Sequence, residues 1–195
     1  MKLRVLLGGF IFLGLWIIIS ALSLVDTLFL AAPWDVGLKL VKLIISGQLL
    51  IDIAFTLGRA IFSLLLSIFL GIPLGLLLGC SKSLRDWLEL PLDFFRSLPV
   101  PVIFPILMIL FGIGEMAKLA GIVFACLFPI VIHTTYGVIN GNQSRIYIFK
   151  RMGFSKYKII LKVIFPESLP YIFVGLRNAL SLSLIATIVV EMLMT

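Results

Sequence analysis

The sequence has few of the residues that usually carry enzyme chemistry. It contains one histidine and two cysteines among 195 residues. The cysteines, Cys80 and Cys126, lie within or beside apolar runs and have no metal-ligand spacing around them. A glycine-rich phosphate loop of the GxxxxGKS type is also missing from the sequence. We therefore expect no catalytic centre, metal or cofactor, and we do not expect the chain to hydrolyse ATP itself.

Charged residues are scarce as well. They make up 13% of the sequence against 62% apolar residues, and the mean hydropathy is +1.24. These values exclude an ordinary soluble domain and indicate a protein that lies in membrane lipid. The net charge of +7 comes from basic residues in short segments beside apolar runs. That pattern favours membrane topology over nucleic-acid binding.

The apolar runs predict an all-α fold, a polytopic membrane bundle of about five transmembrane helices. A crossing needs about 20 mostly apolar residues, and the runs of that length are residues 5–25, 53–80, 91–111, 117–138 and 169–194. The first run is too long for a signal peptide and lacks a clear cleavage site, so we expect an uncleaved helix. We expect residues 26–52 to lie along the outer interface, which makes residues 1–52 an N-terminal part and 53–195 the membrane core.

Glycines and prolines interrupt two of these spans. The second span holds Gly58, Gly71, Pro73, Gly75 and Gly79, a density that favours close helix contacts in lipid. After a short loop expected at residues 81–89, the third span holds Pro91, Pro99, Pro101 and Pro105. These prolines predict a broken helix. Pro99 and Pro101 are candidates for lining a transport pathway, and kinks that serve packing alone are the alternative.

Three ionisable residues inside the predicted spans are further pathway candidates, because such groups are rare in lipid. Arg59 and Arg177 could attract an anion, or they could lie near interfaces and extend their charged ends into water. His133 could contact a solute or relay a proton, or it could bond to a neighbouring helix as a neutral side chain. Glu191 is a candidate partner for either arginine.

Basic residues favour one orientation of the chain. With the N-terminus in the cytoplasm, the outer side carries Lys39, Lys42 and Lys118. The inner side then carries Lys2, Arg4, Lys82, Arg85, Arg96, Arg145, Lys150, Arg151, Lys156, Lys158 and Lys162. Since positive residues concentrate on the cytoplasmic side, we expect a cytoplasmic N-terminus and a cytoplasmic segment at residues 145–162.

The basic segment at residues 145–162 predicts two short surface helices joined at Gly153. Asn142 is expected to cap the first helix and Ser155 the second, and Pro166 is expected to end the second. The side chains expected to rest on the membrane core are Tyr157, Ile160, Leu161 and Ile164. On physical grounds alone, an interfacial helix that binds anionic lipid explains this segment equally well.

The same segment resembles the cytoplasmic signature of the membrane permeases of binding-protein-dependent ATP-binding-cassette importers. That signature is Glu-Ala-Ala, three residues, Gly, nine residues, an aliphatic residue, two residues and Pro, and this chain has Gly153, Val163 and Pro166 at that spacing. From about residue 50 onward the resemblance is closest to the branch that serves nitrate, sulfonate and taurine. It also includes Thr56-Leu-Gly-Arg59, Gly71-Ile-Pro-Leu-Gly75, Arg96-Ser-Leu-Pro-Val-Pro101, Phe111-Gly-Ile-Gly-Glu115, Gly137 and the run at residues 166–177.

The resemblance implies a permease subunit that moves a small anionic solute, sulfonate-like or nitrate-like, across the cytoplasmic membrane. It implies three partners: a cytoplasmic ATPase subunit, an external solute-binding protein and a second copy of the chain. The helix pair around Gly153 would be the coupling helix that docks on the ATPase. The implied coupling residues are Tyr147, Lys150, Gly153, Ser155, Val163 and Pro166.

The chain departs from the family pattern in two places. Tyr147, Ile148 and Phe149 stand where the signature has Glu-Ala-Ala. Relatives also continue past the region of Glu191 with a further crossing, so we expect a permease core that is incomplete at its C-terminus. An inactive fragment is therefore one alternative function.

Two other classes of membrane protein fit the sequence less well. An ion-coupled secondary transporter would need a buried acidic residue in mid-span and an internal repeat, whereas Asp52, Asp93 and Glu191 lie near span ends. A membrane-embedded enzyme would need polar catalytic pairs at one depth, and the sequence offers no convincing pair.

Overall fold

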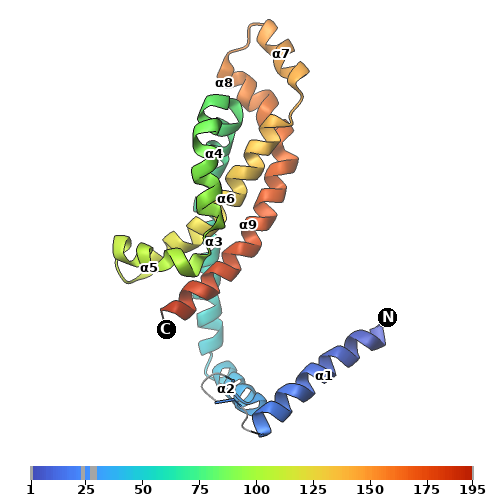
Figure 1. Cartoon of the computed structure of the whole chain (residues 1–195), viewed down its shortest axis with the longest axis vertical. Coiled ribbons are helices and arrows are strands. Elements are labelled where there is room, and N and C mark those ends of the chain that lie inside the picture. Colours follow the sequence, from blue (N-terminus) through green and yellow to red (C-terminus); the bar gives the residue numbers. More distant parts are fainter. Residues whose placement is uncertain (1, 23–24, 27–29, 195) are drawn as a thin grey trace. The chain divides into compact units, whose positions relative to one another are not determined.

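The computed structural model describes residues 2–22, 25–26 and 30–194 (Figure 1). Every regular element in these residues is helical, which confirms the predicted all-α class. The helices are α1 Lys2–Ala21, α2 Pro33–Ile45, α3 Gln48–Cys80, α4 Lys82–Ser97, α5 Val100–Phe111, α6 Glu115–Ile139, α7 Gln143–Arg151, α8 Lys156–Ile159, a π-helical turn Ile160–Ile164 and α9 Phe165–Leu193. The chain forms two compact units, Met1–Ala54 and Phe55–Thr195.

The first unit holds α1, α2 and the start of α3. The Trp16 indole donates a hydrogen bond to the Ala31 carbonyl over 3.1 Å. Helix α2 begins at Pro33, a position that suits proline because the first N–H groups of a helix have no partner within it. The helix expected to start at residue 53 starts at Gln48 instead. Residues 23–24 of the first predicted span and 27–29 of the predicted interfacial segment lie outside the described residues.

In the described part of the chain, three helices are long and apolar enough to cross a membrane. They are Gln48–Cys80, Glu115–Ile139 and a continuous helix from Lys156 to Leu193. The pair α4 and α5 would add a fourth if the bent pair forms one span. In α1 the described apolar stretch, Phe10–Ala21, is shorter than a crossing. The predicted polytopic membrane bundle is therefore supported by three clear spans and one broken span.

The region expected to be a loop at residues 81–89 is helical, so that prediction is wrong. Ser81 starts α4 by accepting a hydrogen bond from the Leu84 amide over 3.3 Å. The break comes later, at Leu98, which is extended (ψ 120°) because the following Pro99 disfavours the helical conformation. Helices α4 and α5 meet there at 103°. The predicted broken helix is confirmed, but residues 91–111 do not form one straight span.

Glycines bring α3, α6 and α9 close together in the second unit. On α3, the residues that face α6 are Gly71, Gly75 and Gly79. A Cβ added to Gly75 would lie 2.8 Å from the Val131 carbonyl oxygen, and one added to Gly175 on α9 would lie 2.9 Å from the His133 Cβ. Helix α9 runs beside α6 (Figure 1). The expected close contacts of the glycine-rich span are confirmed, because these separations leave no room for side chains.

Pro166 does not end the second surface helix, contrary to the prediction. The chain runs without a break through the π-helical turn Ile160–Ile164 into α9. The Phe165 N–H bonds to the Ile160 carbonyl in this wider turn, which accommodates a proline ring and its missing N–H. The expected contact face is confirmed for Ile160 and Ile164 and wrong for Tyr157, which is 71% exposed while Ile159 is buried.

Candidate functional site

Helix α7 is fixed at its first turn by two side chains. The Asn142 side-chain oxygen Oδ1 accepts hydrogen bonds from the Ser144 and Arg145 amides at 3.0 and 3.3 Å, as the sequence predicted. Glu167, in the first turn of α9, accepts from the Asn142 amide at 2.8 Å and from the Arg145 guanidinium at 3.1 Å. Sequence reasoning missed Glu167, although an acidic residue directly after Pro166 in a basic segment was an available signal. These contacts bind the start of α7 to α9.

The chain turns between α7 and α8 at Gly153, which has a φ of 80°. Such a φ is unfavourable for residues with a side chain, so glycine suits this turn. Its amide donates to the Lys150 carbonyl over 3.2 Å. Ser155 occupies the N-cap position of α8, but its side chain makes no capping hydrogen bond. The expected Ser155 cap is therefore wrong.

Residues 143–164, which we call the α7–α8 segment, pack on the end of α6 through an apolar underside. Val138 of α6 forms a buried cluster with Ile159, Val163 and Ile164 of the segment, and Ile146, Phe149 and Phe154 pack against it. The Phe149 and Phe154 rings meet edge to face with centroids 5.2 Å apart. Val163, one of the predicted coupling residues, is thus part of the core. It cannot touch a partner directly.

The opposite face of the α7–α8 segment is exposed. Tyr147, Ile148 and Met152 are more than half exposed, and Lys150, Gly153 and Ser155 are exposed too. The Arg151 guanidinium lies over the Tyr147 ring, 4.8 Å from its centroid, and bonds to its hydroxyl. Tyr147 is therefore held in place by its own helix, and the segment presents an aromatic and basic surface.

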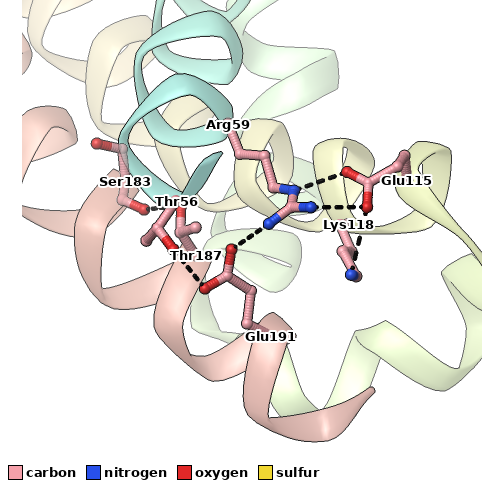
Figure 2. A network of polar contacts seen from close by, with 7 residues as sticks. All are labelled: Thr56, Arg59, Glu115, Lys118, Ser183, Thr187 and Glu191. Carbon is pink, nitrogen blue, oxygen red and sulfur yellow. Dashed lines mark hydrogen bonds and ion pairs between the residues drawn. The ribbon is translucent and has the colours of Figure 1, made fainter. Parts of the chain in front are cut away.

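A second polar site joins three helices through Arg59 (Figure 2). The Arg59 guanidinium on α3 donates to both oxygens of Glu115 on α6, at 2.7 and 2.9 Å. It also donates to Glu191 on α9 at 2.6 Å. Thr56 donates to Glu191 at 2.9 Å, and Lys118 lies 3.4 Å from Glu115. The pairing of Glu191 with Arg59 is one that the sequence suggested, whereas Glu115 was missed.

This charged network contains two cations and two carboxylates. The Arg59 side chain is 21% exposed and that of Glu191 25% exposed, so the pair is shielded from water more than an ordinary surface pair. The Arg59 charge is balanced by two carboxylates, and it therefore offers little attraction to a free anion. Its geometry suits a clamp that holds α3, α6 and α9 together.

His133 lines a groove between α4, α6 and α9, which has a volume of about 510 Å³. Its Nε2 lies 3.2 Å from the Asn178 side-chain nitrogen on α9. Asn178, Ser181 and Arg96 line the same groove. The sequence suggested a bond from His133 to a neighbouring helix, and the structure identifies Asn178 as the partner. Asn178 itself was missed, although it is a polar residue inside a predicted span.

The other pathway candidates lie apart from this groove. Arg177 is exposed on α9, and among the described residues it has no ion pair. Pro99 and Pro101 are exposed at the bend between α4 and α5. In the described part of the chain, no cluster of three or more His, Cys, Asp or Glu side chains is placed to hold a metal ion.

Comparison with known proteins finds a family whose matched residues include the α7–α8 segment. Residues 67–195 match the family described as binding-protein-dependent transport system inner membrane component. The chain is 29% identical to the taurine transport system permease protein TauC of Escherichia coli over 188 residues, 94% of this chain and 68% of that protein. It is 31% identical to the probable ABC transporter permease protein BMEII0107 of Brucella melitensis over 181 residues, 93% of this chain and 72% of that one.

A further relative is the nitrate import permease protein NrtB of Leptolyngbya laminosa. The two are 32% identical over 142 residues, 73% of this chain and 51% of NrtB. The relatives that align with nearly all of this chain are longer than it is, and the chain spans 66–72% of their length.

Proposed function

Since the chain belongs to the family of binding-protein-dependent transport system inner membrane components, we propose that it is the permease subunit of an ATP-driven importer for a small anionic solute. The observation that carries the proposal is the match over residues 67–195. This match includes the α7–α8 segment, which has one exposed face and is anchored on a membrane-spanning helix.

The proposed solute class is a small oxyanion of the sulfonate or nitrate kind. The printed functions of two relatives support it, because TauC is a taurine permease and NrtB a nitrate permease. Taurine carries a sulfonate group, so both solutes present several oxygens that share one negative charge. A permease for such solutes needs hydrogen-bond donors rather than carboxylates along its path.

The α7–α8 segment is proposed to dock on a separate cytoplasmic ATPase subunit. Tyr147 and Lys150 lie on its exposed face, while Glu167 and the apolar underside bind it to α9. A displacement of α7 would therefore move α9, which spans the membrane as part of one continuous helix. An aromatic and basic surface replaces the acidic Glu-Ala-Ala contact, so the facing ATPase surface is expected to be acidic or apolar.

The proposed orientation of the chain in the membrane determines where its other partners would bind. The basic residues at 145–162 support a cytoplasmic position for the α7–α8 segment and the N-terminus. A solute-binding protein would then deliver the solute at the opposite membrane face. A second copy of the chain would enclose the path, with lipid around the pair in the cytoplasmic membrane.

The docking role is tested by two matched alanine variants. Gly153 and Gly112 have φ values of 80° and 79°, and neither has a neighbouring atom within 4 Å of an added Cβ. Gly112 also has a ψ of 167°, a region that only glycine readily occupies, so alanine there should strain the backbone at least as much as alanine at Gly153. Only Gly153→Ala should disturb the turn between α7 and α8. We expect it to lower solute-stimulated ATP hydrolysis roughly fivefold or more in the complex co-purified with the ATPase.

Gly112→Ala serves as the control and should leave that activity unchanged. If both variants lose activity equally, the docking role of the α7–α8 segment is wrong. If the wild-type chain inserts into membranes and folds but retains no ATPase on purification, the proposed function itself is wrong.

A further inference from the structure

We propose that the groove between α4, α6 and α9 is the oxyanion-binding site of the transport path, with His133, Asn178 and Arg96 as its donors. This inference rests on the proposed function, because it specifies where the solute's charged group binds. The groove is called the His133 groove below.

The first support is a hydrogen-bonded pair between two spanning helices. His133 on α6 and Asn178 on α9 meet at 3.2 Å. They can approach because Gly175 has no side chain where α9 crosses His133. Each polar group in a spanning helix is costly unless it has a partner. The pair therefore indicates that this face of α6 and α9 borders a polar space rather than lipid.

The pair also retains donors for a ligand. When Asn178 donates to Nε2, the proton of a neutral His133 ring is on Nδ1. The Nδ1–H and the second N–H of the Asn178 amide are then available. In the described residues neither side chain has another hydrogen bond. Two neutral donors side by side suit an oxyanion, which accepts hydrogen bonds through several oxygens.

Charge in the groove favours the same ligand. Arg96 lines it, and among its described lining residues there is no carboxylate. Arg96 does pair with Asp93 through Nε at 3.0 Å, but a guanidinium has further N–H donors for a ligand. Asp93 therefore weakens the site without abolishing it. A modest affinity is what a transport path requires, since the solute must also leave.

The walls of the groove are apolar and ordered. Phe95, Phe124 and Phe128 stack edge to face, with centroid separations of 6.4 and 5.0 Å, and all three line the groove. An apolar wall strengthens electrostatic contacts beside it and can hold the carbon part of an alkyl sulfonate. A volume of about 510 Å³ leaves room for such a solute.

Because the chain has a single histidine, His133 can be observed without ambiguity. The purified chain would be labelled with ¹⁵N-histidine in lipid nanodiscs and its ring signals followed by NMR. The titrants would be nitrate and methanesulfonate, compared with neutral dimethyl sulfone and with chloride at equal ionic strength. We expect a saturable shift of the His133 signals with the two oxyanions only.

Variants identify the donors. Asn178→Asp keeps the side-chain size but adds a negative charge, and Arg96→Gln removes the cation. The new carboxylate of Asn178→Asp should repel the oxyanion, and Arg96→Gln should remove its cationic donor. Each variant should therefore weaken oxyanion binding about tenfold or more. Arg177→Gln is the matched control. It also removes one positive charge, from the position next to Asn178 but outside the groove, and it should leave the titration unchanged.

Three results would overturn the inference: no saturable shift, an equal shift with chloride or dimethyl sulfone, or an equal loss in Arg177→Gln and Arg96→Gln. Chemical-shift dispersion and helical circular dichroism show in the same samples that each variant is folded. Failure of the titration leaves the proposed function standing if the ATPase complex forms. Failure of that complex rejects the function whatever the titration shows.

Discussion

Arg59 connects carboxylates from two other helices, and its replacement should destabilise the fold. Arg59→Gln leaves Glu115 and Glu191 without the three hydrogen bonds that they accept from the guanidinium. We expect the free energy of unfolding to fall by about 1–3 kcal/mol, because the partly shielded Glu191 loses its guanidinium partner, while the exposed Glu115 contributes less. Denaturant unfolding in detergent micelles, followed by circular dichroism, measures the change.

Lys118→Gln provides the matched comparison. It removes the same charge, but Lys118 makes a single 3.4 Å contact with an exposed carboxylate. The expected loss is below about 1 kcal/mol. Equal losses in the two variants would show that net charge, rather than the geometry of the network, determines stability.

Single residues were predictable where the local backbone decides their role. Gly153 and Asn142 act within one turn, and both were found in the expected conformations. The partners Glu115 and Asn178 were missed, because the sequence does not show which residues of different helices meet; Glu191 was named only as a partner for either of two arginines. Only the packing of whole helices brings such groups together.

At the scale of elements, proline had two different effects. Pro99 breaks the chain because the preceding Leu98 becomes extended. Pro166 leaves the helix continuous, since a π-helical turn accommodates it. The sequence rule that proline ends a helix holds for the first and fails for the second. Of the predicted contact residues, Ile160 and Ile164 do pack on the core, whereas Tyr157 and Leu161 are exposed and the buried Ile159 was missed.

Removing Pro166 should allow the π-helical turn to relax into an ordinary α-helix. Losing the extra residue of that turn would rotate α8 by about 100° relative to α9. In a Cys80→Ser background, Ile159→Cys is buried and should react slowly with maleimide. We expect Pro166→Ala to make this cysteine react at least as fast as one at the exposed Lys158.

Pro170 offers the control, because it lies inside α9 beyond the π-helical turn. Pro170→Ala should leave the labelling of Ile159→Cys slow. Unchanged labelling in Pro166→Ala would mean that packing of the apolar underside, rather than proline, maintains the turn.

At the scale of the molecule, the membrane class and the family features were predictable, because apolar length and motif spacing are properties of the chain itself. The five-span count was not fully predictable. Residues 91–111 had the composition of a crossing, yet the chain bends by 103° between α4 and α5. The apolar composition of a segment predicts that it lies in lipid, but it does not predict whether its helix is straight or bent.

Within the second unit, α6 has the charged network at one end and the α7–α8 segment at the other. Its 25 residues extend about 37 Å, against about 30 Å of hydrocarbon. The two ends should therefore reach opposite membrane faces. In a Cys80→Ser background, a membrane-impermeant maleimide should label Ile113→Cys in spheroplasts and Met152→Cys only in inverted vesicles.

Buried Cys126 should remain unlabelled from either side, which controls for loss of structure. Labelling of both introduced cysteines from the same side would refute this topology. Labelling of each from the reverse side would refute the proposed cytoplasmic position of the N-terminus.

The charged network also fixes an order of events during synthesis. Arg59 precedes Glu115 by 56 residues and Glu191 by 132 residues. At typical bacterial and eukaryotic elongation rates, the interval between Arg59 and Glu191 is roughly 7–26 s. During that time only α3 and α6 can be joined through Arg59. Helix α9 can therefore join this network only after α3 and α6 have been made, when Glu191 adds the second carboxylate.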